Sequence, residues 1–283
     1  SSRVVSLTEI GPMAKRIEAG GVLVEALEMR ALRKRIRGFV NLTKLIRQYR
    51  PHVIQTWLYH ADLIGGLAAI GYPAPVIWNL RQSNLHPSQS KLSTRTTVKI
   101  CARLSRVLPN AIICGSKSAY EVHAALGYST QSMRVIPNGV DLDRFKPNPA
   151  ARVAIREELD VPLSTPLVGL IARFDPQKDH ALFVQAAATV AQANDRVQFV
   201  LCGPGIDHDN RSLVKWINAT GLNDRFRLVG PREDIASLTA ALDVSVSSSL
   251  YGEGFSNTLT ESLACGVPCV TTDVGDSRDI VGN

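Results

Sequence analysis

Short apolar runs alternate with longer amphipathic stretches along this 283-residue sequence, and this alternation restricts the possible folds most strongly. The predicted strands are Val4–Leu7, Val53–Thr56, Val76–Trp78, Ala111–Cys114, Val135–Ile136, Leu167–Ile171, Val197–Leu201, Phe226–Val229, Val244–Ser247 and Pro268–Thr271. The predicted helices are Ala31–Tyr49, Ala61–Ile70, Thr94–Leu104, Ser118–Leu126, Ala181–Ala191, Asn210–Ala219, Asp234–Leu242 and Asn257–Ala264. Apolar strands that alternate with helices are typical of parallel sheets covered on both faces, so the sequence predicts an α/β protein.

A turn-rich segment interrupts this pattern near the middle of the chain. Residues 137–149 contain three prolines, one glycine and two asparagines, a composition typical of a linker. We therefore predict two domains, 1–147 and 148–283, which suits the length of the chain. Parallel α/β sheets bind ligands outside the carboxyl ends of their strands, so the two domains are expected to face each other across a nucleotide-binding cleft.

The two halves differ in charge. Residues 1–145 contain 20 Lys and Arg against 8 Asp and Glu (net +12), and residues 146–283 contain 12 against 17 (net −5), which together give the net charge of +7. Basic surfaces attract nucleic acids, anionic lipids and phosphorylated substrates alike. The charge difference therefore indicates different partners for the two halves without identifying them.

Much of the positive charge lies in residues 30–50. Eight cations occur there without an acid, while Leu32, Ile36, Phe39, Val40, Ile46 and Tyr49 recur at helical spacing and predict one apolar face. One interpretation is the solvated outer face of a domain helix. Another is peripheral contact with anionic membrane, where each basic residue contributes about 1 kcal/mol. Nucleic-acid binding is not predicted, because no aromatic interleaving accompanies the charge.

The cysteines and the longest apolar runs bear on the compartment. The five cysteines form no C-x-x-C pair, which favours small buried side chains in a reducing environment. No apolar run reaches the roughly 18–20 residues that a membrane-spanning helix needs. We predict a cytoplasmic protein, with peripheral contact at the inner face of the plasma membrane if the basic helix binds lipid.

The strongest local motif is Tyr-Gly-Glu-Gly-Phe-Ser-Asn-Thr-Leu-Thr-Glu at residues 251–261. Asn257 is predicted to cap a helix whose first N–H groups form an anion site. Glu253 precedes this helix, and Glu261 lies about one turn inside it. Carboxylates beside a phosphate site suit hydroxyl binding, although Glu261 could equally cap or pair structurally.

A second motif follows the strand Leu167–Ile171. Arg173 ends this strand, and Lys178 precedes the next helix. Two cations at the carboxyl end of a strand can neutralise a diphosphate leaving group, with the guanidinium binding in bidentate fashion. As isolated residues they could equally pair with Asp175 and Asp179.

These motifs, together with Pro-Asn-Gly-Val-Asp at residues 137–141, occur in an order and at separations that resemble glycosyltransferase family 4. The resemblance extends from Arg3 to Gly282 and implies the GT-B fold, two Rossmann-like domains that face each other across a cleft. Residues 56–66 and 272–276 resemble a subgroup associated with O-antigen and exopolysaccharide assembly.

The resemblance also implies a role for each matching residue. Arg173 and Lys178 would hold the donor diphosphate, Glu253 would face the donor sugar, and Glu261 would bind the ribose. The remaining implied contacts are His60 with the transferred sugar, Leu228 and Val229 with the base, and backbone of Gly254, Phe255, Ser256, Asn257, Thr258 and Leu259 with sugar hydroxyls and phosphate.

Asp141-Leu142-Asp143 matches the Asp-x-Asp pattern by which another glycosyltransferase fold holds a metal. It follows a turn rather than a nucleotide-binding strand, so we interpret it as a capping or hinge element and expect no metal and no cofactor. The family begins with a strand and a glycine-rich loop and ends with further strands and a helix. We expect this chain to be truncated at both ends.

The resemblance implies retaining transfer of a sugar from a nucleoside-diphosphate sugar, with a UDP-linked donor favoured, to a saccharide or lipid-linked saccharide acceptor in bacterial surface-polysaccharide synthesis. The presence of Arg173, Lys178 and both glutamates favours catalysis over its alternatives, because a pure scaffold would not need that set. Those alternatives are a non-catalytic nucleotide-sugar-binding protein and a GT-B enzyme of another reaction type, such as a sugar-nucleotide epimerase.

Overall fold

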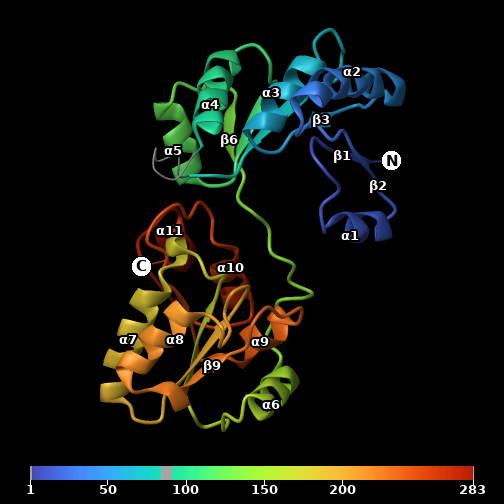
Figure 1. The fold of residues 1–283 in the computed structure, drawn as a ribbon. Helices are drawn as coiled ribbons and strands as arrows, with labels where there is room; N and C mark the ends of the chain where they lie inside the picture. Colours follow the sequence, from blue (N-terminus) through green and yellow to red (C-terminus); the bar gives the residue numbers. More distant parts are fainter. Residues whose placement is uncertain (1, 84–90, 283) are drawn as a thin grey trace. The chain divides into compact units, whose positions relative to one another are not determined.

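A computed structural model describes residues 2–83 and 91–282 of the chain. The chain divides into two compact units (Figure 1). Unit 1 comprises Ser1–Arg81, Leu85–Gly115 and Tyr120–Ile136, and unit 2 comprises Gln82–Asn84, Ser116–Ala119 and Pro137–Asn283. The main division thus falls at Pro137, at the start of the turn-rich segment, whereas the sequence analysis placed the boundary after Pro147.

Unit 1 is built mainly on a four-stranded parallel sheet with the strand order β3-β4-β5-β6. Strands β1 and β2 pair in parallel as a separate sheet. The strands are β1 (Arg3–Ser6), β2 (Leu23–Ala26), β3 (Ile54–Gln55), β4 (Val76–Leu80), β5 (Ala111–Cys114) and β6 (Met133–Val135). The helices are α1 (Ala14–Ala19), α2 (Leu32–Tyr49), α3 (Tyr59–Ala68), α4 (Leu92–Leu104) and, for the greater part, α5 (Lys117–Ala125). The sequence analysis missed α1 and β2, because both are short and lack a clear apolar period.

The core of unit 1 is apolar with a few polar groups enclosed. Trp78, Leu80 and Ile112 are completely buried in the sheet. Asp62 of α3 is also completely buried, and its Oδ1 accepts a hydrogen bond of 2.5 Å from Thr56 Oγ1. Burial raises the pKa of Asp62 to about 7. The contact ties the start of α3 to the end of β3.

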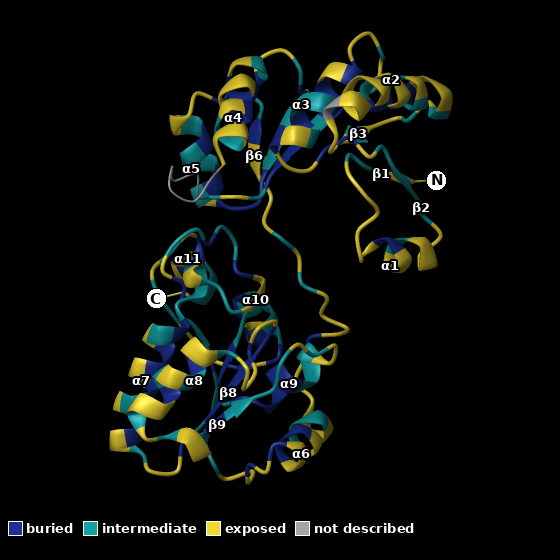
Figure 2. Cartoon of the chain, viewed as in Figure 1, coloured by how far each residue is buried: buried dark blue, intermediate teal, exposed yellow. Residues whose placement is uncertain are grey.

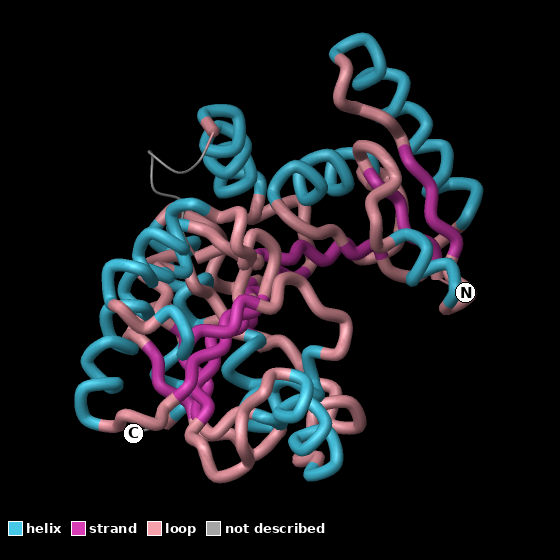
Figure 3. Tube along the Cα trace, turned by 60° about the horizontal axis from the view of Figure 1, so that its bottom comes forward, coloured by secondary structure: helices cyan, strands magenta, loops and turns pink. Residues whose placement is uncertain are grey.

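Unit 2 is a five-stranded parallel sheet with the strand order β11-β10-β7-β8-β9, and its strands run side by side in Figure 3. The strands are β7 (Leu167–Ile171), β8 (Gln198–Cys202), β9 (Phe226–Leu228), β10 (Val244–Ser247) and β11 (Cys269–Thr271). The helices are α6 (Pro149–Glu158), α7 (His180–Ala193), α8 (Arg211–Thr220), α9 (Ile235–Ala241), α10 (Asn257–Ala264) and α11 (Ser277–Val281), with short 3-10 turns η1 (Pro176–Lys178) and η2 (Asn223–Arg225). The parallel sheets confirm the predicted α/β class.

Successive residues of β8 point to opposite faces of this sheet, which gives unit 2 two core clusters. Phe199 and Leu201 pack with residues of α7 and α8. Val200 and Cys202 pack with residues of α6 and α9, on the other face (Figure 1). Helices therefore cover both faces, as the uninterrupted apolar strands predicted.

Helix α6 lies where the sequence analysis expected only a linker. Pro149 starts the helix, and Asn148 Oδ1 caps it by accepting from the Ala151 N–H at 3.0 Å. Arg156 is 1% exposed, and its guanidinium donates to backbone carbonyls and to Asp243, at the start of β10. Burial raises the pKa of Asp243, but hydrogen bonds from the Leu167 N–H, Arg152 and Arg156 outweigh this effect and hold the pKa below its usual range.

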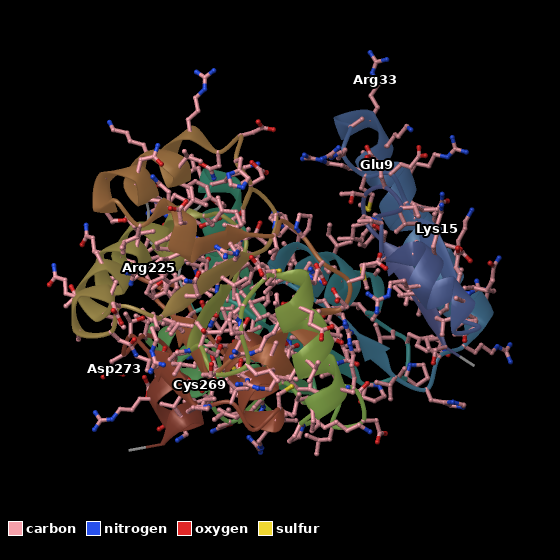
Figure 4. The ribbon with its side chains drawn as sticks, turned by 90° about the horizontal axis from the view of Figure 1, so that it is seen from below. Glu9, Lys15, Arg33, Arg225, Cys269 and Asp273 are labelled. Atoms are coloured by element: carbon pink, nitrogen blue, oxygen red, sulfur yellow. The ribbon has the colours of Figure 1, made fainter. Side chains whose placement is uncertain are left out.

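The prediction of one apolar face on helix α2 is wrong in part. Leu42 and Ile46 are buried, but Ile36 and Val40 are 78% and 43% exposed, so these two side chains face solvent. The helix is largely exposed in Figure 2, and the side chain of Arg33 extends away from the ribbon in Figure 4. Among the described helices, none combines the length and apolar character that a bilayer-spanning segment requires.

The cysteines behave as the sequence predicted. All five thiols are free; Cys101, Cys114, Cys202 and Cys265 are buried and Cys269 is partly buried.

Candidate functional site

Charged and polar side chains lie together in unit 2 at the carboxyl ends of β7 and β10, which are neighbours in the sheet. A pocket lies there, lined by Leu170, Ile171, Ala172, Lys178, Val246, Ser247, Ser248, Ser249, Ser256 and Thr258. This is the edge at which parallel α/β sheets bind ligands. The two strongest sequence motifs meet at this pocket, although β7 and β10 are far apart along the chain.

An ion pair joins these motifs. Lys178 Nζ donates to Glu253 Oε2 at 2.7 Å, and the side chains are 17% and 9% exposed. Ser249 Oγ donates to the same carboxylate oxygen at 3.0 Å. Lys178 thus pairs with Glu253 and not with Asp179, the alternative that the sequence left open. A largely desolvated ion pair of this kind places a cation and an acid at fixed positions beside the pocket.

Arg173 lies on the exposed side of the same network. Its Nε donates to Asp175 Oδ2 at 3.2 Å, which is the pairing that the sequence allowed. Its Nη2 donates to Gln177 Oε1 at 3.1 Å, while Gln177 Nε2 lies 3.5 Å from Glu253 Oε2. Gln177 therefore bridges Arg173 and Glu253. The sequence analysis missed Gln177 and Ser249, because an uncharged side chain near a charged motif gave no separate signal.

The turn η1 positions Lys178 through local hydrogen bonds. Asp175 Oδ1 accepts from the Gln177 N–H at 2.9 Å and so caps the turn. Asp179 adopts a left-handed conformation (φ 43°) and caps α7 through the Leu182 N–H. Ser248 Oγ donates to the carbonyl of Lys178 at 2.8 Å. The backbone around Lys178 is thus held from both β7 and β10.

The start of α10 forms one wall of the pocket. Ser256 is the N-cap residue and its side chain makes no cap hydrogen bond; the prediction that Asn257 caps the helix is wrong, because Asn257 is its first residue. Asn257 Oδ1 instead accepts from Asn138 Nδ2 at 2.9 Å. In the described part of the chain, the N–H groups of residues 257–259 have no recorded acceptor. N–H groups without an acceptor at a helix start can bind an anion, and the anion site expected for this helix terminus stays a prediction.

A close backbone contact fixes the loop that carries Glu253. The Asp276 N–H donates to the Gly254 carbonyl at 3.0 Å. At Gly275 (φ +64°) a Cβ atom would lie 1.7 Å from the Glu253 carbonyl oxygen. Only glycine fits this position, for steric and conformational reasons together.

Glu261 lies on α10, one turn beyond its start, as predicted. Its side chain is half-buried, and burial raises the pKa of its carboxyl against the opposing effect of Arg144. Its backbone carbonyl accepts from the Cys265 N–H at 3.1 Å, but within the described residues its carboxylate makes no hydrogen bond or ion pair, so the structural capping or pairing role that the sequence left open is not seen there. Its carboxylate remains available to a ligand.

Two predicted base contacts lie at the end of β9. Leu228 is its last residue and packs against the core of the α7 and α8 face. Val229 follows, packs against the opposite core, and donates its N–H to the Leu201 carbonyl at 3.1 Å. Both are partly buried, so core packing accounts for much of their environment, while their position remains at the carboxyl edge of the sheet.

His60 belongs to unit 1. It is an exposed residue in the first turn of α3. The contact of His60 with the transferred sugar, which the resemblance implies, stays a prediction.

Asp141 forms a turn in unit 2. Its Oδ1 accepts from the N–H groups of Asp143 and Arg144 at 3.0 and 3.1 Å, which agrees with the predicted capping role. Within residues 2–83 and 91–282, no group of three or more His, Cys, Asp or Glu side chains is arranged to hold a metal ion.

The structure is an α/β protein in which cations, carboxylates and the start of a helix lie together at the carboxyl edge of a parallel sheet. A model of glycosyltransferase family 4 matches residues 3–144, half of the chain, and a model of group 1 glycosyl transferases matches residues 165–283. The chain belongs to glycosyltransferase family 4.

Individual relatives agree with this membership. The UDP-Gal:alpha-D-GlcNAc-diphosphoundecaprenol alpha-1,3-galactosyltransferase of Escherichia coli is 25% identical over 257 residues, 89% of this chain and 66% of that protein. The 2-deoxystreptamine glucosyltransferase of Streptomyces kanamyceticus is 27% identical over 274 residues, 89% of this chain and 70% of that protein. The chain thus spans just under two thirds of the E. coli relative.

A solved structure shows the same fold. HepE from Anabaena in complex with UDP aligns with a TM-score of 0.86 and 22% identity over 99% of this chain and 75% of that one. This likeness confirms the GT-B fold.

Proposed function

We propose that the protein is a retaining glycosyltransferase that moves a sugar from a nucleoside-diphosphate sugar to a saccharide or lipid-linked saccharide acceptor. The observation that carries this proposal is the 2.7 Å ion pair of Lys178 and Glu253 beside the uncapped start of α10. The carboxyl edge of the unit 2 sheet thus has cations that could bind a diphosphate and backbone N–H groups that could bind phosphate oxygens. It also has carboxylates that could bind hydroxyl groups.

The charges suggest how the donor would be activated. Breaking the bond between the sugar and the diphosphate develops negative charge on the leaving oxygen. Arg173 and Lys178 would stabilise this charge electrostatically, with the N–H groups of residues 257–259. Glu253 would orient the sugar and Glu261 the ribose. In this proposal the leaving phosphate accepts the acceptor's proton, the anomeric configuration is retained, and neither a covalent intermediate nor a metal takes part.

Relatives support a UDP-linked donor. The E. coli relative is named for UDP-Gal and a diphosphoundecaprenol-linked sugar, and HepE has been solved with UDP and with UDP-glucose. We extend these chemistries to this chain, with a role in bacterial surface-polysaccharide synthesis.

Nucleotide titration tests the donor site. UDP and its sugar conjugates are expected to raise the melting temperature with or without EDTA, and GDP is expected to act more weakly. A ligand at 100 times its dissociation constant stabilises by about 2.7 kcal/mol. Arg173→Ala and Glu261→Ala should lose most of this shift, because each removes a proposed donor contact. A folded sample that no nucleotide stabilises would contradict the proposal, and nucleotide binding without sugar transfer in the presence of acceptors would favour a non-catalytic binding protein.

Helix α2 supports peripheral contact with an anionic membrane as part of this proposal. Arg30 and Lys34 pair with Glu9 and Glu28. In the described part of the chain, the other cations of residues 30–50 have no recorded acidic partner and are exposed: Arg33, Arg35, Arg37, Lys44, Arg47 and Arg50. The exposed Ile36 and Val40 lie among them one turn apart. Exposed apolar side chains bordered by cations are typical of helices that lie on lipid headgroups.

Vesicle co-sedimentation tests this contact. The protein is expected to bind phosphatidylglycerol vesicles and not phosphatidylcholine vesicles. Because each basic residue contributes about 1 kcal/mol, Arg33→Ala/Arg37→Ala should lower the partition coefficient about 30-fold. The exposed pair Arg103→Ala/Arg106→Ala removes the same charge outside α2 and should have a much smaller effect. If the two double variants lower the partition coefficient equally, vesicle binding depends on the net charge of the protein and not on α2.

A further inference from the structure

The carboxyl ends of β3 and β4 carry an aromatic residue and a cation that the donor site does not use. Trp57 follows β3 and Arg81 follows β4, and these strands are neighbours in the sheet of unit 1. The Arg81 guanidinium carbon lies 4.8 Å from the centroid of the Trp57 ring. The two side chains therefore form a cation–π pair at the ligand-binding edge of this sheet.

The backbone holds Trp57 in place although its side chain is 53% exposed. The Thr56 N–H donates to the Ile77 carbonyl at 2.9 Å, and the Leu58 N–H donates to the Asn79 carbonyl at 3.2 Å. Both neighbours of Trp57 are thus bonded to β4. Exposure of the indole is consequently a property of the sheet edge and does not come from a loose loop.

Arg81 is positioned by equally specific contacts. Its Nη2 donates to Asn79 Oδ1 at 3.2 Å. Asn79 is completely buried, and its own Nδ2 donates to the Thr56 carbonyl at 2.9 Å. Gly115 leaves room for the arginine, because a Cβ there would lie 3.1 Å from Arg81 Nη1. The Asn79 amide, the space beside Gly115 and the Trp57 ring all contribute to the position of the Arg81 guanidinium.

An exposed, rigidly held tryptophan beside polar groups can bind a ligand that has both an apolar face and hydrogen-bonding groups. Indole contributes a large, flat, apolar surface whose face is electronegative. The C–H groups on one face of a pyranose ring are apolar and slightly electropositive, and its hydroxyls project around the rim. Such a ring can pack on Trp57 while a ring oxygen or hydroxyl accepts a hydrogen bond from Arg81. Preorganised side chains lose little entropy when a ligand binds.

We propose that Trp57 and Arg81 form a subsite for a pyranose ring of the saccharide acceptor. This inference rests on the proposed function, since it assigns the acceptor rather than the donor to this edge of unit 1. Trp57 supplies the stacking surface, and Arg81 fixes the orientation of the ring through its oxygen atoms.

Ligand-observed NMR titration tests the subsite without requiring turnover. The probes are methyl α-D-galactopyranoside, methyl α-D-glucopyranoside and N-acetyl-α-D-glucosamine 1-phosphate, each with and without UDP. At least one probe is expected to bind saturably, with transfer of saturation to its C–H protons. Trp57→Ala should raise the dissociation constant about tenfold or more, Trp57→Phe should restore part of the affinity, and Arg81→Gln should weaken binding. Val107→Ala, which removes another exposed apolar side chain of unit 1, should leave binding unchanged.

The outcomes separate this inference from the proposed function. Loss of pyranoside binding in Trp57→Ala, with the UDP-induced stabilisation retained, supports the subsite. Saturable pyranoside binding that is unaffected by Trp57→Ala overturns it, and so does the absence of saturable binding by every probe. In both of these cases a normal response to UDP leaves the proposed donor site standing. If UDP does not stabilise the wild-type protein, the result instead contradicts the proposed function.

Discussion

Replacing Lys178 by alanine is expected to lower kcat/KM for sugar transfer about 10²–10³-fold, the loss typical of removing one group that stabilises developing charge. Lys178 lines the pocket, its side chain is less exposed than that of Arg173, and its Nζ lies 2.7 Å from the Glu253 carboxylate. Its removal takes away charge that the diphosphate would need as the glycosidic bond breaks. The change should appear in steady-state kinetics with a UDP-sugar donor and in single-turnover measurements alike.

Two further variants test whether the loss of kcat/KM comes from the position of Lys178 in the pocket. Lys215→Ala removes an exposed lysine of the same unit, on α8, and should retain wild-type rates. Lys178→Ala also leaves the buried Glu253 without its cation, which costs stability. Adding Glu253→Gln should recover stability without recovering activity. A folded Lys178→Ala protein with kcat/KM within about threefold of wild type would exclude the proposed role of Lys178.

Gly275→Ala is expected to have the second-largest effect, on stability and donor binding together. The added methyl group would lie 1.7 Å from the Glu253 carbonyl oxygen, so the loop carrying Glu253 must move. The left-handed conformation costs an L-residue about 1–2 kcal/mol, and overpacking adds about 1–3 kcal/mol. Urea unfolding should therefore show a lower midpoint, and the dissociation constant for UDP should rise at least about tenfold.

Gly221→Ala is the matched control. Gly221 also has a left-handed conformation (φ +71°), but no atom lies within 4 Å of the position of its Cβ. This variant should lose only the conformational contribution and should bind UDP normally. If both variants are destabilised equally and bind UDP equally well, the contact between Gly275 and Glu253 does not organise the site.

Much of the fold follows from local signals in the sequence. The structure places strand β7 at Leu167–Ile171 and helix α10 at Asn257–Ala264, the ranges that the apolar pattern predicted. Both signals are local: a strand buried on both faces is apolar throughout, and Gly266 followed by Pro268 ends a helix. Helix α6 was missed for a related reason. Asn148 and Pro149 are helix-start residues, but they occur within a proline-rich segment that also reads as a linker.

The sequence by itself determined the α/β class, most of the strands, the longer helices and the types of the candidate site residues, because burial, capping and charge act over a few neighbouring positions. Only the tertiary structure decided which of these residues meet. Lys178 had an acid next to it in the sequence, Asp179, yet pairs with Glu253 because β7 and β10 are adjacent in the sheet. The same adjacency gives Gln177 its bridging position between Arg173 and Glu253. Strand order is set by the packing of the whole unit, so contacts across it have no signature in any short stretch of sequence.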